Sequence, residues 1–465
     1  MDDFGRVARQ RLPTRAVLFL DQQEHVGKFR YRFFSRGHER MASGNRGNFC
    51  HPPVRLVPVD DKLVVIETHA LIVVRPRRRT KLARNDAVSV RPPIPRDTMS
   101  KMHRRAFLQA PLITVISKQP QYYHAWPTMA RRANGELVIA YSGGREGHVD
   151  PFGRVEFSRS KDNGQTWSWP QVIMDTPIDD RDAGIVETPR GTLLATTFTS
   201  LAYETYLADA KAKSWDPARI ERWQSVQRAT TAAERKALLG TWMLRSTDGG
   251  LHWSAPYRVP LNSPHGPVAL RDGRLLYAGK RLWDAKAEIG VCESTDDGLT
   301  WRWLAEIPTR PGDTAVQYHE LHAVQAADGR LIAHIRNHNT PNDRETLQSE
   351  STDGGKTWST PRPIGVWGLP SHLLRLADGR LVMTYGYRRD PRGNHARVSR
   401  DHGQTWSEPI IISNDGKGDI GYPSTVEVAP GKLLTLWYES KRSGSVTATL
   451  PEPPFSELRL ASWTL

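Results

Sequence analysis

Six short segments of the chain concentrate side chains that bind polar ligands or transfer protons. They combine histidine, acidic residues, arginine and tyrosine with aromatic rings whose faces pack against sugars. The segments are His124-Ala125-Trp126-Pro127, Asp179–Asp182, Ser263–Gly266, Tyr318–His322, Pro370–His372 and Asp419–Pro423. Charged side chains can fix the hydroxyl or carboxylate groups of a sugar, so this combination favours a carbohydrate ligand.

A pattern Ser-x-Asp-x-Gly-x-x-Trp recurs five times and indicates the elements that carry these segments. Each copy follows a strand-like stretch, so Asp and Gly are expected to satisfy the backbone of a hairpin turn while Trp packs beneath it. The aspartates of the pattern are therefore interpreted as structural. The copies begin at Ser160, Ser246, Ser294, Ser351 and Ser399.

A second repeat, a glycine turn followed by an apolar strand, alternates with the first and occurs six times. Strands at this spacing predict an all-β fold, a six-bladed β-propeller over residues 106–465 with four-stranded blades. The strand near Ile113–Ser117 is expected to close the sixth blade by pairing with strands that end at Leu458–Leu465. In a propeller the inner strands begin at the central channel, so the six polar segments should converge on one site. The six turns contain Gly135, Gly191, Gly273, Gly329, Gly379 and Gly431.

Residues 203–240 interrupt the repeat and are rich in Ala, Glu, Arg and Leu, with apolar positions three to four residues apart. This spacing predicts a helical insert. Two interpretations stay open: a lid over the central site, or a packing decoration of one blade.

The first 105 residues differ in composition from the rest. They hold 23 Lys and Arg against 10 Asp and Glu, whereas residues 106–465 hold 42 against 40. Basic and Pro-rich runs predict a disordered extension or leader. Arg104-Arg105 resembles a twin-arginine signal, which suggests secretion or a periplasmic location. The nearly neutral remainder argues against nucleic-acid binding. No apolar run is long enough to span a membrane.

The repeats resemble those of the sialidase (neuraminidase) superfamily, whose members carry Asp-box (BNR) repeats on a six-bladed propeller. The resemblance covers about residues 111–465 and implies hydrolysis of a terminal acidic sugar, sialic acid or a related one, without a cofactor. It implies Tyr422 as the nucleophile, polarised by Glu320, because a neutral phenol approaches the anomeric carbon beside a carboxylate without charge repulsion. It also implies Asp150 as the acid/base.

The resemblance further implies a cluster of arginines that binds the substrate carboxylate. Arg336 matches one of its members, and Arg145 lies beside Asp150. A further member is Arg388, Arg389 or Arg392, of which Arg388 is favoured. Ala125 stands where the first clamp arginine is expected, which would cost on the order of 2–3 kcal/mol of carboxylate binding. Either Arg145 or Arg181 compensates, or the substrate is not an ordinary sialic acid.

The remaining candidates for sugar contacts come from the six segments. No metal-binding spacing is present, so their histidines are not expected to hold a metal. The acidic run Asp179–Asp182 is open to two interpretations, a hairpin turn or an acid/base pair. These additional substrate-binding candidates are Asp180, Asp182, His124, Trp126, His265, His322 and His372.

Three functions therefore remain open for this chain. An exo-glycosidase of sialidase type is favoured by Tyr422 and Glu320 together. A non-hydrolytic carbohydrate-binding propeller, or a polysaccharide lyase or other glycosidase on the same fold, is favoured by the missing arginine at Ala125.

Overall fold

The computed structural model describes six strands between residues 17 and 74, and then residues 111–440 and 456–465. The chain divides into two compact units, Met1–Arg104 and Arg105–Leu465. The prediction of a disordered extension concerns residues that lie mostly outside this description, as do the Arg104-Arg105 pair and Cys50. The first unit contains two antiparallel sheets, one of β1 (Val17–Leu20), β2 (Phe29–Ser35) and β3 (His38–Gly44), the other of β4 (Arg55–Val59), β5 (Lys62–Glu67) and β6 (Ala70–Val74).

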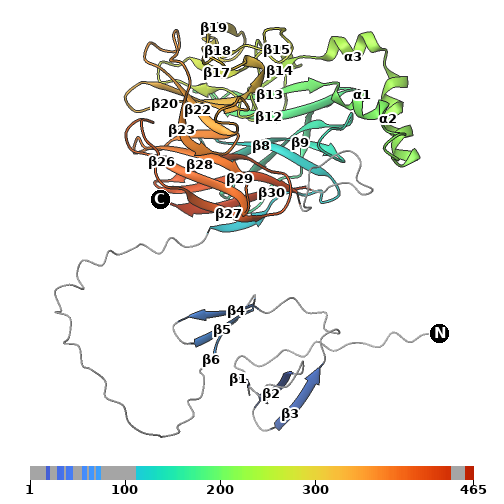
Figure 1. Ribbon diagram of the computed structural model, residues 1–465, viewed down its shortest axis with the longest axis vertical. Coiled ribbons are helices and arrows are strands. Elements are labelled where there is room, and N and C mark those ends of the chain that lie inside the picture. Colours follow the sequence, from blue (N-terminus) through green and yellow to red (C-terminus); the bar gives the residue numbers. More distant parts are fainter. Residues whose placement is uncertain are drawn as a thin grey trace, which may run out of the picture. The chain divides into compact units, whose positions relative to one another are not determined.

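The second unit consists of six four-stranded antiparallel sheets arranged as a propeller, which confirms the predicted fold (Figure 1). The first three blades follow the sequence from inner to outer strand. Blade 1 contains β8 (Tyr123–Arg131), β9 (Leu137–Arg145), β10 (Arg154–Ser160) and β11 (Gln171–Met174). Blade 2 contains β12 (Asp179–Glu187), β13 (Leu193–Ser200), β14 (Thr241–Ser246) and β15 (Tyr257–Arg258). Blade 3 contains β16 (Val268–Ala269), β17 (Leu275–Lys280), β18 (Ile289–Ser294) and β19 (Arg302–Glu306).

Blades 4 and 5 repeat this order, whereas the outer strand of blade 6 comes from the start of the second unit. A short 3-10 helix, η2 (Ala315–Gln317), precedes blade 4. Blade 4 contains β20 (Tyr318–Gln325), β21 (Leu331–Asn337), β22 (Glu345–Ser351) and β23 (Arg362–Trp367). Blade 5 contains β24 (Ser371–Arg375), β25 (Leu381–Tyr387), β26 (Arg392–Ser399) and β27 (Ile410–Gly416). Blade 6 contains β28 (Ile420–Ala429), β29 (Lys432–Ser440), β30 (Ser456–Thr464) and β7 (Leu112–Val115).

The ring closes as predicted, because β7 pairs antiparallel with the C-terminal strand β30, with Val115 opposite Arg459. Apolar side chains of blades 6 and 1 also pack together, including Leu434 and Leu436 of β29 with Leu137 of β9. Closure therefore joins the two ends of the propeller by backbone hydrogen bonds and by a shared core, and it pairs the edge of β30 that would otherwise be exposed.

The five Asp-box aspartates have the structural role that the sequence predicts. In the fourth box, Asp353 accepts hydrogen bonds from the backbone N–H and the hydroxyl of Thr357, at 3.0 and 2.6 Å. The hydroxyl of Ser351 donates to the same carboxylate, and the indole of Trp358 donates to the carbonyl of Gly355. The first, third and fifth boxes repeat the bonds to Asp, so these aspartates hold turns at the surface.

The predicted insert is helical and consists of α1 (Ala202–Ala208), α2 (Pro217–Ala229) and α3 (Ala232–Leu238), drawn in green in Figure 1. Asp216 caps α2 and Thr231 caps α3 with a capping box, which explains where both helices begin. Tyr203 and Trp223 of the insert share an apolar cluster with Val149 of the loop between β9 and β10. The insert therefore packs on the loop that contains Asp150.

None of the described helices is long and apolar enough to cross a membrane.

Candidate active site

Four inner strands carry a β-bulge near the end at which the strand begins. The pairing of β8, β12, β20 and β28 with their neighbours skips a residue there, and the backbone at Trp126, Asp182 and Tyr422 takes positive φ values of 50°, 50° and 54°. Bulges re-aim side chains, and positive φ in bulky residues is rare and costs free energy. Such repeated strain at the channel end of three inner strands marks this end as the functional one.

Tyr422, Glu320 and Arg336 form a hydrogen-bonded group across blades 4 and 6. The Tyr422 hydroxyl donates to Glu320 Oε1 at 2.7 Å, and Arg336 Nη1 donates to the same oxygen at 2.9 Å. Arg336 Nη1 also lies 3.1 Å from the Tyr422 hydroxyl. The fold thus brings together three residues that the sequence selected from three different strands.

The electrostatics of this group favour an ionised Glu320 and a neutral Tyr422. Burial raises the pKa of Glu320, but Arg336, His319 and the Tyr422 hydroxyl outweigh it and lower the pKa to about 2. Burial and the neighbouring Glu320 hold the pKa of Tyr422 well above its usual value. Glu320 is therefore an ionised hydrogen-bond acceptor for the neutral Tyr422 hydroxyl.

Asp419, just before β28, is the centre of a second polar group. Its Oδ2 accepts hydrogen bonds from the hydroxyls of Tyr123 and Tyr438, at 3.0 and 2.8 Å, and lies 3.2 Å from His148 Nδ1. Arg388 Nη2 lies 3.5 Å from Asp419 Oδ1. Burial opposes ionisation of Asp419, but Arg388 and these hydrogen bonds lower its pKa.

Of the residues that surround Asp419, the sequence predicted Arg388 but not Tyr123, His148 or Tyr438. Tyr438 lies directly opposite Gly421 in the β28–β29 ladder, and that register was the signal that could have found it. Tyr123 and His148 come close only because the first blade lies beside the sixth.

Arg145 and Arg181, the two candidates to compensate for Ala125, differ in their bonding. Every nitrogen of the fully buried Arg145 donates a hydrogen bond, including one of 2.6 Å to Asp179 and one of 2.6 Å to Ser142 Oγ. Arg181 makes only a 3.6 Å ion pair with Asp179, and its buried Nε has no partner among the described residues. Only Arg181 therefore has donors to spare for a ligand.

Trp126 occupies the space beside these arginines. The Arg181 and Arg145 guanidinium groups lie over its ring at 4.5 and 4.8 Å, and Tyr422 packs edge-on at 6.4 Å. The ring is buried, and its cation–π contacts hold the two guanidinium groups at one side of the site.

Three histidines from blades 3, 4 and 5 cluster within the channel. The His322 ring stacks on that of His372 at 4.5 Å, and His265 lies 5.3 and 5.1 Å from the two. Burial lowers the pKa of His265 to about 3, and the only charged group acting on it is Glu320. His322 Nδ1 accepts the backbone N–H of Leu373 at 2.9 Å, which assigns the proton to Nε2. No group of three potential ligands with metal-binding geometry occurs within the described residues.

Three of the other predicted residues are held by the scaffold. Asp150 accepts the backbone N–H of Glu146 at 2.6 Å and that of Phe152 at 2.9 Å, and it is 1% exposed. Asp180 accepts the N–H and hydroxyl of Thr176. His124 contacts Ser456 of the closing strand, away from Tyr422.

Glu146 connects the Asp150 loop to the helical insert. Its carboxylate accepts Arg219 Nε at 2.6 Å and the Trp223 indole at 2.7 Å, and it pairs with Arg222. Replacing Glu146 by Gln should weaken the hold of α2 on the loop by about 1–3 kcal/mol, because the buried indole and two guanidinium groups lose their anionic acceptor.

This prediction is checked by limited proteolysis of the insert. Faster cleavage near Lys211 and Lys213 in the Glu146→Gln variant is expected, with Glu221→Gln, which removes an exposed pair with Arg228, as the matched control. Equal cleavage of both variants would contradict the role assigned to Glu146.

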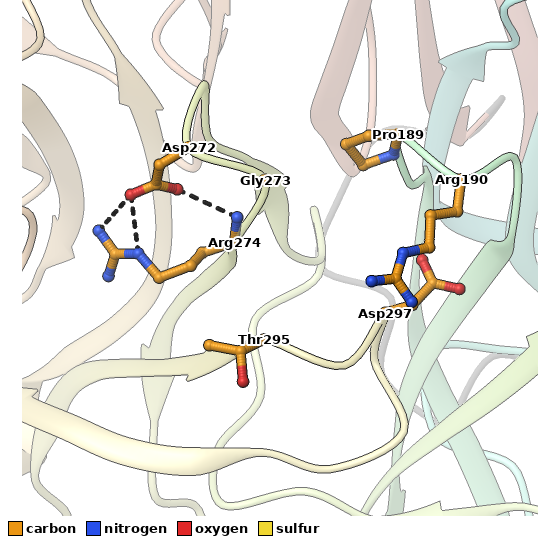
Figure 2. Close-up of a pocket in the computed structure, with 7 residues that line it drawn as sticks. All are labelled: Pro189, Arg190, Asp272, Gly273, Arg274, Thr295 and Asp297. Carbon is orange, nitrogen blue, oxygen red and sulfur yellow. Dashed lines mark hydrogen bonds and ion pairs between the residues drawn. The ribbon is translucent and has the colours of Figure 1, made fainter.

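A hollow at the opposite end of the inner strands has a different character (Figure 2). It lies among the turns of blades 2 and 3, and three of its charged groups are bound to the protein: Arg274 Nε donates to Asp272 at 2.8 Å, and Asp297 accepts the hydroxyls of Thr188 and Thr192. Paired side chains of this kind stabilise turns. Its lining residues are Pro189, Arg190, Asp272, Gly273, Arg274, Thr295 and Asp297.

The Asp-box repeats and the six four-stranded sheets define the class of the fold as a six-bladed β-propeller. Residues 220–434 match the family model described as a BNR repeat-like domain. Among the solved structures that resemble this chain is a Dyadobacter fermentans protein of unknown function. The TM-score is 0.62 and the sequence identity 22%, and the match covers 77% of this chain and 100% of that one. These structures also include the NanB sialidase of Streptococcus pneumoniae, with a TM-score of 0.55, 15% identity and coverage of 94% and 88%.

Curated relatives match over shorter stretches. A xyloglucanase of Acetivibrio thermocellus is 27% identical over 186 residues, which is 35% of this chain and 20% of the relative. A sialidase of Micromonospora viridifaciens is 24% identical over 215 residues, which is 39% of this chain and 31% of the relative. The chain thus spans between a fifth and a third of the length of these relatives. Their names describe glycosidases, and the predicted resemblance is confirmed for the fold and the repeats.

Proposed function

We propose that this chain is a glycosidase of sialidase type that releases a terminal acidic sugar from a glycan. The observation that carries the proposal is the 2.7 Å hydrogen bond from the Tyr422 hydroxyl to Glu320, beside Arg336. An ionised carboxylate in contact with a neutral phenol is the arrangement that a tyrosine nucleophile needs, because the phenol must lose its proton as it attacks.

The reaction assigned to these residues has two displacements. Tyr422 attacks the anomeric carbon, its proton passes to Glu320, and the leaving oxygen takes a proton from a general acid as its bond breaks. Water then displaces Tyr422 from the same carbon and gives a proton to the conjugate base of that acid, while the phenolate recovers its proton from Glu320. Two displacements retain the configuration at the anomeric carbon.

The charge of the site supports an anionic sugar. Arg181, Arg336 and Arg388 come from three blades: Arg336 Nη1 lies 3.1 Å from the Tyr422 hydroxyl, and Tyr422 contributes to the raised pKa values of Arg181 and Arg388, which supports a positively charged site. The buried Ala125 of blade 1 offers no positive charge to a ligand, and Arg181 of blade 2 would supply one in its place. A carboxylate bound among these groups would accept charge-assisted hydrogen bonds.

The test is turnover by the full chain of a fluorogenic sialoside, of aryl uronides and of a neutral aryl glucoside. Arg388→Met is expected to lower kcat/KM for the acidic substrate about 10- to 100-fold, mainly through KM, because one charged hydrogen-bond donor is lost. Arg389→Met is the matched control, since the neighbouring Arg389 stacks on Trp367.

The outcomes separate the candidate functions. Turnover of an acidic glycoside that depends on Arg388 supports the proposal and names the sugar. Turnover of the neutral glucoside alone, which the xyloglucanase similarity would fit, overturns the acidic substrate. Binding without turnover would support the carbohydrate-binding alternative, which the missing arginine at Ala125 favours.

A further inference from the structure

Asp182 occupies on blade 2 the bulge position that Tyr422 occupies on blade 6. Arg181 and Gly184 pair with Phe198 and Thr196, two residues apart on β13, so one residue of β12 is extra. Gly421 and Ser424 pair with Tyr438 and Leu436 in the same way. In both strands the first bulged residue has φ near 50°. Equivalent backbone geometry in equivalent inner strands points both side chains toward the channel.

The Asp182 carboxyl differs from the other acidic groups of the site in its bonding. Asp179 is bound by Arg145, Asp419 by two tyrosine hydroxyls, and Asp150 by two backbone N–H groups. Asp182 is 6% exposed, and its Oδ1 is buried with no hydrogen-bond partner among the described residues. A buried carboxyl group without a hydrogen-bond partner costs free energy, and so does a strained backbone. Both costs are explained if Asp182 binds a ligand or carries a proton.

Asp182 also experiences the charges of the nucleophile group. Burial raises its pKa to about 7, Arg181 opposes this rise, and Glu320 adds to it. Further charged or titratable groups that act on it or respond to it are Arg145, Arg336, Tyr277, Tyr422 and Tyr438. Near neutral pH this carboxyl exchanges between its acid and its carboxylate, as a proton donor and acceptor must.

We propose that Asp182 is the catalytic acid and base of the reaction, an inference that rests on the proposed glycosidase function. In the first displacement the Asp182 carboxyl gives its proton to the leaving oxygen as the glycosidic bond breaks and the bond to Tyr422 forms. In the second, its carboxylate takes a proton from the water that attacks the anomeric carbon. Protons and electron pairs balance over the two steps, and the acid is regenerated.

This assignment replaces Asp150, which the family resemblance had implied. Burial raises the pKa of Asp150 to about 7 as well, but its two carboxylate oxygens accept the backbone N–H groups of Glu146 and Phe152, whereas Asp182 Oδ1 has no partner among the described residues. These bonds fix the turn between β9 and β10 and leave Asp150 the role of a positioning residue.

The test compares Asp182→Asn with Asp150→Asn on two aryl glycosides of the acidic sugar, one with a nitrophenol and one with a poorly acidic alcohol as leaving group. Asparagine keeps the carboxyl's shape and tolerates positive φ, so Asp182→Asn preserves the bulge. It should lower kcat/KM about 10²- to 10⁴-fold for the poor leaving group and far less for nitrophenol, which departs without a proton.

Two further measurements make the test specific. In the wild type kcat/KM should fall as pH rises through about 7, because the acid loses its proton, and this limb should vanish in Asp182→Asn. Azide should restore release of the nitrophenol by that variant and give a glycosyl azide, since azide needs no base.

The opposite pattern would overturn the assignment. If leaving-group dependence and azide rescue appear with Asp150→Asn and not with Asp182→Asn, Asp150 is the acid and base. If Asp182→Asn fails to fold by circular dichroism, Asp182→Gly, which also permits positive φ, takes its place. A wild-type chain that cleaves none of the substrates refutes the proposed function itself, and with it this inference.

Discussion

Tyr422→Phe should lose activity by about 10³-fold or more in kcat while substrate binding changes little. The substitution removes the nucleophilic oxygen and leaves the ring, Glu320 and Arg336 in place. The measurement is steady-state kinetics on the acidic aryl glycoside, together with intact-mass spectrometry of acid-quenched enzyme. Wild-type enzyme should gain the mass of one glycosyl residue, and the variant should not.

The matched control is Tyr438→Phe, which removes the hydroxyl of another buried tyrosine of the same blade. That hydroxyl donates to Asp419 at 2.8 Å, so its loss should cost about 1–3 kcal/mol of stability and reduce kcat much less. Similar losses of kcat in the two variants would show that the tyrosines act as a hydrogen-bonded network, and would refute Tyr422 as nucleophile.

Asp179→Ala should destabilise the propeller by about 3–5 kcal/mol, because it leaves Arg145 buried without its anionic partner. Both side chains of this pair are 0% exposed, and Asp179 also lies 3.6 Å from Arg181. The urea midpoint of unfolding, followed by circular dichroism and tryptophan fluorescence, measures the effect.

Asp175→Ala is the control for this prediction, since Asp175 precedes the same inner strand and is exposed. It should change the stability by no more than about 0.5 kcal/mol. If Asp179→Ala also changes the free energy of unfolding by no more than about 0.5 kcal/mol, water or a relaxed loop provides hydrogen-bond acceptors for Arg145. The pair would then not be needed to hold the first two blades together. Arg181 would then be free to move toward a ligand in the wild type as well.

The helical insert bears on the site indirectly. Its apolar cluster includes Val149, and Glu146 binds Arg219 and Trp223 of α2. Besides a lid or a packing decoration, these contacts therefore suggest a third role for the insert, which is to brace the loop that begins at Arg145. A brace needs no motion to act, because it fixes the backbone from which Arg145 reaches Asp179.

Much of the fold follows from the sequence, because its signals are local. Each Asp box closes its own hairpin through bonds within five residues, such as Asp353 to Thr357, so the pattern predicts the turn wherever it occurs. Six glycine turns then fix the number of blades, and ring closure follows from the need to pair the last sheet edge. The helical insert is equally local, since caps and apolar spacing define it.

The candidate site depends on information that the sequence carries only partly. Tyr422, Glu320 and Arg336 could be selected because they lie in motifs, but their contact spans about a hundred residues and exists only because blades 4 and 6 face one channel. The sequence left open which of Arg145 and Arg181 could serve a ligand. Their hydrogen bonds favour Arg181, since Asp179 and Ser142 engage Arg145, whereas Arg181 Nε has no partner among the described residues.

The sequence by itself determined the repeat, the blades and the residue types at the channel, because hairpins and turns are encoded by neighbouring residues. Only the tertiary structure distinguished Asp182 from Asp150. Their difference lies in backbone conformation and in hydrogen bonding: Asp182 lies in a bulge with φ 50° and its buried Oδ1 has no partner among the described residues, whereas two N–H groups of its own loop bind Asp150. Burial and hydrogen bonding, which set the chemistry of a carboxyl group, are properties of the assembled fold.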